Sequence, residues 1–185
     1  MEFRLTYDGY LPSAGSNTRK KEKHDIRMRL HPQLCELWRT HPGLEDLEPI
    51  WQRDCLVTAG GWQFQPLVTS RRHLHCYLKI LFLRPGSPGK LISDGGDIDN
   101  RIKTLFDALR APTPDELPDP NPPGGGVVCC LLENDSLISG FEVETDQLLG
   151  GQAGGGAPID PSQVRLVIQV TVKNAHFVMG YGLMV

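Results

Sequence analysis

The amino-acid sequence predicts a mixed α+β fold, with helices packed on a mixed sheet. Residues 2–7 and 164–172 alternate apolar and polar side chains, which is the pattern of half-buried strands. Residues 98–109 instead place apolar side chains on one face of a helix. Strand-like and helix-like segments follow in the order strand, helices, strand, helix, strands, which favours one domain over residues 1–185.

The composition is typical of a folded protein with long loops. Of the 185 residues, 39% are hydrophobic and 22% are charged, and the formal net charge is -3, which argues against wholesale disorder. Proline and glycine concentrate at 111–126 and 150–160, where we expect long loops. The chain has no apolar run long enough for a membrane span and no signal-peptide pattern at its N-terminus. We therefore expect a cytoplasmic protein with no membrane partner.

The five cysteines are scattered and contain no C-x-x-C pair, so the spacing indicates neither a zinc knuckle nor a disulfide framework. We expect reduced and mostly buried thiols, as is usual in a cytosolic protein. These cysteines are Cys35, Cys55, Cys76, Cys129 and Cys130.

The first half of the chain contains a basic segment and two candidate helices. The segment at about 16–30 carries six basic and two acidic residues, and we interpret it as a basic N-terminal arm. Pro32 is suited to the first turn of a helix whose apolar residues are Leu34, Leu37 and Trp38. A second short helix is a candidate over 44–54, although Pro49 weakens it.

The second half contains the clearest elements. Residues 73–83 are rich in apolar side chains and predict a strand. The helix over 98–109 has Asp97 as a candidate N-cap and ends before Pro112. Further strands are predicted at 127–132, 137–143 and 164–172.

Three carboxylates in this half are candidates for a metal site. Asp97 and Asp99 stand two residues apart at the entrance of the predicted helix, and Asp135 follows a predicted strand. If the helix packs beside that strand, the three side chains converge and repel one another unless a cation lies between them. Carboxylate oxygens suit Mg²⁺ or Mn²⁺, which can activate water. Lys103, one helical turn after Asp99, could stabilise charge that develops on a phosphate.

Each of these residues also has a purely structural interpretation. Asp97 could only cap the helix, and Asp99 could only favour the helix dipole or pair with Lys103 on the surface. Asp135 could belong to a turn. Asp107, one turn beyond Lys103, is more typical of a solvated helix position. The spacing leaves these interpretations open.

The pattern Asp-Ile-Asp-Asn-x-x-Lys-x-x-x-Asp-Ala-Leu at 97–109, followed by Asn-Asp-Ser-x-Ile at 134–138, resembles the RusA family of Holliday junction resolvases. The resemblance implies a RusA-like nuclease domain with Asp97, Asp99 and Asp135 as metal ligands and Lys103 as the catalytic lysine. It also implies that Asn100 and Asn134 lie next to these ligands and support them. Asn134 stands where the family has the first aspartate of an Asp-Asp pair.

The family members are bacterial or phage-derived homodimers that use Mg²⁺ or Mn²⁺. The resemblance therefore implies an endodeoxyribonuclease that resolves four-way DNA junctions by paired symmetric nicks during recombination and repair. The basic arm would neutralise DNA phosphates through Arg19, Lys20, Lys21, Lys23, Arg27 and Arg29. The arm could equally be only solvated. Two alternative functions stay open: a non-cleaving branched-DNA-binding protein of a mobile element, and a metal-dependent nucleotide hydrolase.

Overall fold

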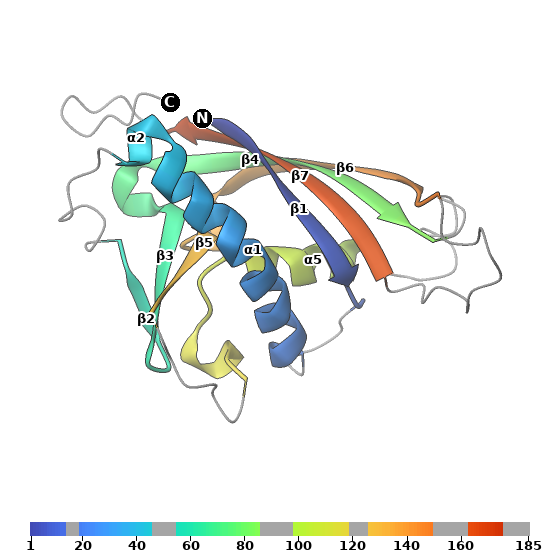
Figure 1. Cartoon of the computed structure of the whole chain (residues 1–185), viewed down its shortest axis with the longest axis horizontal. Coiled ribbons are helices and arrows are strands. Elements are labelled where there is room, and N and C mark those ends of the chain that lie inside the picture. The colour runs from blue at the N-terminus through green and yellow to red at the C-terminus, as the bar shows by residue number, and fades with distance from the viewer. Residues whose placement is uncertain (14–18, 46–54, 86–97, 119–125, 150–162, 176–185) are drawn as a thin grey trace.

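The computed structural model describes residues 1–13, 19–45, 55–85, 98–118, 126–149 and 163–175. Figure 1 shows how the elements of these segments are arranged. The helices are α1 (Lys20–Thr40), α2 (Pro42–Glu45) and α5 (Ile98–Leu109), with short 3₁₀ turns η1 (Ser70–Arg72), η2 (Pro114–Glu116) and η3 (Asp135–Leu137). The strands are β1 (Glu2–Tyr10), β2 (Val57–Ala59), β3 (Trp62–Val68), β4 (Leu74–Arg84), β5 (Val127–Leu132), β6 (Ile138–Gln147) and β7 (Gln163–Asn174).

The larger sheet is four-stranded, in the order β1-β7-β4-β6. β7 runs antiparallel to both of its neighbours, whereas β4 and β6 are parallel, so the sheet is mixed as predicted. The register places Leu5, Ile168, Ile80 and Val143 in one line across all four strands. The first three of these side chains are fully buried, so the alternation seen in the sequence marks the inner face of this sheet.

The strands form two sheets rather than the single sheet expected from the sequence. The second sheet has the order β2-β3-β5, with β3 antiparallel to β2 and parallel to β5. A two-residue turn joins β2 to β3, and its residues Gly60 and Gly61 both have positive φ, 54° and 82°. Glycine adopts this backbone region without the steric cost that a side chain brings.

The described part of the basic segment, residues 19–30, leads into the long helix α1 and does not form a separate arm. The predicted start at Pro32 is wrong, because α1 begins at Lys20 and Pro32 lies exposed inside it. The apolar pattern misses the first turns because charged side chains occupy much of their inner face. The buried residues of α1 are Lys23, His24, Ile26, Arg27, Leu30, Leu34 and Trp38. None of the described helices combines the length and the apolar character needed to cross a membrane.

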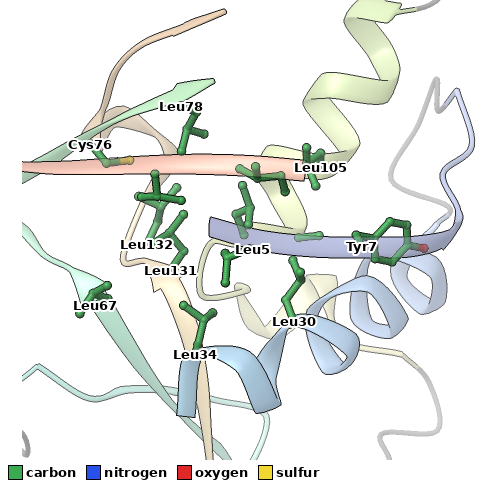
Figure 2. Close-up of a cluster of buried hydrophobic side chains, with 14 of the residues drawn as sticks. Leu5, Tyr7, Leu30, Leu34, Leu67, Cys76, Leu78, Leu105, Leu131 and Leu132 are labelled. Atoms are coloured by element: carbon green, nitrogen blue, oxygen red, sulfur yellow. The ribbon is translucent and has the colours of Figure 1, made fainter. Parts of the chain in front are cut away.

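The main core lies between the four-stranded sheet and the helices α1 and α5 (Figure 2). Leu30 and Leu34 of α1 and Leu105 of α5 belong to one buried cluster with Leu5 and Leu78 of the sheet. The helix predicted at 98–109 is therefore confirmed with its apolar face inward. Truncating one such leucine to alanine typically costs about 2–5 kcal/mol of folding free energy.

A smaller cluster covers one face of the three-stranded sheet. It joins Trp62 and Phe64 of β3 and Val128 of β5 to Ala111 and Leu117. The start of the predicted loop 111–126 is thus packed against the sheet through η2. Part of that loop, the whole of 150–160 and most of the candidate helix 44–54 lie outside the described residues.

Candidate functional site

Three of the predicted site residues, Asp99, Asn100 and Lys103, lie on the first turns of α5. Asp99 and Lys103 are exposed, and Asn100 between them is half-buried, with its backbone oxygen accepting a hydrogen bond from the Thr104 hydroxyl at 2.9 Å. The partner carboxylate Asp97 lies outside the described residues. α5 therefore presents a carboxylate and an ammonium group to solvent near its N-terminal end, where the helix dipole favours anions.

The third predicted carboxylate, Asp135, lies in η3 between β5 and β6. Its side chain is exposed, and η3 contacts α5. Asn134 caps this turn, because its side-chain oxygen accepts a hydrogen bond from the Ser136 N–H at 2.9 Å. Aspartate caps a turn in the same way, so the turn by itself does not require asparagine at position 134.

The described part of the chain does not by itself assemble an acidic three-ligand site. The only trio of His, Cys, Asp or Glu side chains there whose donor atoms all lie within 4.8 Å of one another is His31, Cys35 and Cys129. The predicted acidic trio requires Asp97, which is not among the described residues. Asp99 and Asp135 thus lie on two contacting elements, α5 and η3.

Asp107 belongs to a buried ion-pair network rather than to a solvated helix face. Its carboxylate lies 2.7 Å from the Lys23 ammonium and 3.4 Å from the Arg110 guanidinium. Arg110 also binds Glu116 through two hydrogen bonds. Burial alone would raise the pKa of Glu116, but the hydrogen bonds from Arg110 and Thr113 outweigh it and lower that pKa below its usual value. This network ties α1, α5 and η2 together.

Two of the six predicted DNA-binding residues are used inside the fold. Lys23 is buried by its pair with Asp107, and Arg27 is buried with hydrogen bonds to the backbone oxygens of Arg110 and Asp107. Burial lowers the pKa of Arg27 to about 10, so this guanidinium still carries its charge at neutral pH. These two cations hold the C-terminal end of α5 and are not displayed to a phosphate backbone.

The other four basic residues lie at or near the surface. Arg29 is exposed, but it donates a hydrogen bond of 2.6 Å to the Asp8 backbone oxygen and lies over the Tyr7 ring. Lys21 is exposed, and Arg19 and Lys20 are half-buried at the start of α1. The basic surface that the structure leaves for an anionic partner is therefore shorter than the sequence predicts.

Comparison with known proteins identifies no relative. No protein-family model, curated protein or solved structure matches this chain. The resemblance to the RusA resolvases therefore depends on the residues at 97–109 and 134–138.

A cluster of nitrogen and sulfur donor groups lies where α1 packs against β5. Cys35 Sγ lies 3.3 Å from His31 Nδ1, and the Cys129 backbone N–H donates to the same Nδ1 at 2.9 Å. Burial lowers the pKa of His31, so its imidazole is neutral at neutral pH. Burial and a hydrogen bond with Cys35 raise the pKa of the Cys129 thiol.

This cluster was not predicted from the sequence. The expectation of mostly buried thiols is confirmed, since four of the five cysteines are buried and Cys35 is half-buried. The absence of C-x-x-C pairs in the sequence does not bear on donor groups that come from distant segments. The usable signal was the spacing of His31 and Cys35, which places both on one face of a helix. Cys129 joins them only through tertiary packing.

Proposed function

We propose that this chain is a divalent-metal-dependent endonuclease that resolves four-way DNA junctions by paired symmetric nicks. One observation carries the proposal. Asp99 and Lys103 are exposed on α5, Asp135 is exposed in η3, and these two elements contact each other. These are the residues at which the sequence resembles the RusA family, and Asp97 directly precedes α5. The side chains of Asp99, Lys103 and Asp135 are thus exposed to solvent, as the proposal requires.

The donor set fits Mg²⁺ or Mn²⁺. Asp97, Asp99 and Asp135 would bind the ion, because carboxylate oxygens are the ligands that these hard cations prefer. When bound, an ion of this kind would lower the pKa of a coordinated water and neutralise charge on a phosphoryl oxygen. Lys103 would stabilise the negative charge that develops on the phosphate or on the leaving oxygen. Asn100 and Asn134 would support the ligands from adjacent positions.

DNA binding would use the basic residues of this segment that the fold leaves at or near the surface. Lys21 is exposed, and the half-buried Arg19 and Lys20 lie beside it at the start of α1. Arg29 lies further along α1, where it also donates a hydrogen bond to the Asp8 backbone oxygen. Contacts of these residues with DNA would be made to phosphates, so they would fix position without reading sequence. A four-way junction has approximate two-fold symmetry, and a homodimer of this chain would present two identical sites to strands of like polarity.

The test is cleavage of a synthetic four-way junction by the full chain with Mg²⁺, Mn²⁺ or Ca²⁺. We expect symmetric paired nicks with Mg²⁺ and Mn²⁺ that disappear in Asp97→Asn and Asp135→Asn. Glu144→Gln is the matched control, because Glu144 is an exposed carboxylate on β6 that belongs to neither block of the pattern. Equal cleavage by wild type and both aspartate variants would refute the proposal.

The same assay separates the two alternatives. A non-cleaving junction-binding protein would retain the junction in a gel shift and release no nicked product, an outcome that Asn134 favours because the family has aspartate there. Asn134→Asp preserves the cap and adds a carboxylate beside Asp135, so it would restore cleavage if this were the defect. A nucleotide hydrolase would release soluble product from free nucleotides and show little salt-sensitive DNA affinity.

A further inference from the structure

We propose that His31, Cys35 and Cys129 form a binding site for a thiophilic divalent cation, for which Zn²⁺ is the best fit. Their donor atoms all lie within 4.8 Å of one another, although the residues come from α1 and from β5. The site is separate in chemistry from the acidic residues of the proposed nuclease, because it offers sulfur and nitrogen instead of oxygen. It does not depend on that proposal.

The helix and the strand fix the three side chains in different ways. His31 and Cys35 are four residues apart on α1 and therefore share one face of the helix. β5 is an edge strand of the three-stranded sheet, and α1 packs against it. At that edge the Cys129 N–H donates to His31 instead of to another strand. The ring is thus held against the residue whose thiol completes the trio.

The hydrogen bond to His31 also identifies the nitrogen that can bind a cation. Nδ1 accepts the Cys129 N–H at 2.9 Å, so Nδ1 carries the lone pair and Nε2 carries the proton. Nδ1 is also the ring atom nearer to Cys35 Sγ, at 3.3 Å against 3.8 Å for Nε2. A cation at Nδ1 would take over this lone pair. The freed Cys129 N–H could then donate to a thiolate sulfur.

The separations are close to those of a tetrahedral zinc site. Zn–S and Zn–N bonds of about 2.3 and 2.0–2.1 Å place tetrahedral ligands about 3.5–3.8 Å apart. The Nδ1–Sγ distance of 3.3 Å and the 4.8 Å limit for the whole trio differ from these values by about 1 Å or less. Binding also requires the imidazole to turn away from the Cys129 N–H, which occupies the Nδ1 lone pair in this structure. Three protein ligands leave a fourth position for water. His31 and Cys35 are half-buried, so the site has a route from solvent.

A bound cation would tie α1 to β5. Because the ligands come from two elements distant in sequence, the unfolded chain does not present them together, and binding would stabilise the fold. At a free Zn²⁺ concentration about 100 times the dissociation constant, we expect the Tm to rise by about 5–10 °C. Mg²⁺ should not reproduce this rise through the same residues, because it prefers oxygen ligands.

The experiment uses the full chain, reduced and freed of metal, and titrates it with Co²⁺ as a spectroscopic probe and then with Zn²⁺. We expect one equivalent of Co²⁺ to give a thiolate-to-cobalt charge-transfer band that Zn²⁺ abolishes. Cys35→Ser should remove the band and the rise in Tm. This variant keeps the side-chain volume at a half-buried position, so it should fold.

Cys130→Ala is the matched control. It removes the adjacent thiol, which belongs to the smaller core cluster and hydrogen-bonds to the Leu132 backbone oxygen, away from His31. We expect this variant to keep the cobalt band, and His31→Gln to weaken Co²⁺ affinity at least about tenfold. The proposal is overturned if wild type shows no thiolate band, or if the band survives Cys35→Ser. A disulfide between Cys35 and Cys129 in place of metal binding would also overturn it.

Discussion

The ammonium nitrogen of Lys23 lies 2.7 Å from a carboxylate oxygen of Asp107, and each side chain is only about a tenth exposed, at 11% and 12%. This pair joins the first turns of α1 to the last turns of α5. In the sequence both residues resemble surface charges, but in the structure they belong to the interior. Buried pairs of this kind make the protein sensitive to the loss of either partner.

We expect Asp107→Asn to destabilise the protein more than Lys23→Met does. The aspartate variant leaves Lys23 buried without a counterion, at a cost of about 3–5 kcal/mol. In Lys23→Met, Asp107 keeps Arg110 at 3.4 Å, so the loss should be about 1–2 kcal/mol. Urea unfolding of both variants measures the difference. The reverse order would mean that Arg110 does not compensate for Lys23.

The basic residues of α1 should separate into two classes in DNA binding. Lys21 is exposed, so Lys21→Gln should reduce the slope of log affinity against log salt concentration by about 0.9. Arg27 is committed to backbone oxygens of Asp107 and Arg110, so Arg27→Met should lower stability and leave the salt slope unchanged. Fluorescence anisotropy with a labelled junction at several salt concentrations checks both. A change of slope in Arg27→Met would contradict the assignment.

The stability of the fold should fall as the pH falls below the ordinary histidine value of 6.5. His24 is buried against the Trp62 ring at 5.4 Å between centroids, and its Nδ1 has no hydrogen-bond partner. Burial, followed by the charge of Arg27, lowers its pKa, and Asp25 only partly opposes this. Because the unfolded chain takes up the proton at a higher pH, acid favours unfolding.

Replacement of His24 by phenylalanine should reduce this pH dependence, and His31, whose pKa is also lowered by burial, should account for the part that remains. The aromatic ring preserves the contact with Trp62 and removes both the titrating group and the unpaired nitrogen. Urea unfolding between about pH 7.5 and about pH 5 measures the effect. If His24→Phe retains the full wild-type loss of stability over this range, another group causes it.

Asp99→Asn should abolish cleavage without weakening the fold. Asp99 is exposed, so its charge does little for packing, and its removal relieves repulsion among the proposed ligands when no metal is bound. We expect a Tm equal to or slightly above that of wild type without Mg²⁺, and a smaller rise when Mg²⁺ is added. Differential scanning fluorimetry with and without Mg²⁺ tests this. A strongly unfolded variant would mean that Asp99 is structural.

The sequence by itself determined the elements whose side-chain period is local. The alternation at 2–7 and 164–172 located β1 and β7, and the helical spacing at 98–109 located α5. It also located Asp99 and Lys103 on exposed positions of that helix. These predictions hold because the side chains that face the core recur every second residue in a strand and every three to four residues in a helix, so nearby residues reveal the buried face.

Only the tertiary structure decided which polar residues belong to the interior. Arg27 and the Asp107 carbonyl that it binds are 80 residues apart, so no local pattern distinguishes this arginine from a DNA-binding one. His31 and Cys129, 98 residues apart, likewise meet only because α1 covers the edge of β5. A charged or thiol side chain is buried when a partner from elsewhere in the chain satisfies it, and that partner is set by packing rather than by sequence neighbours.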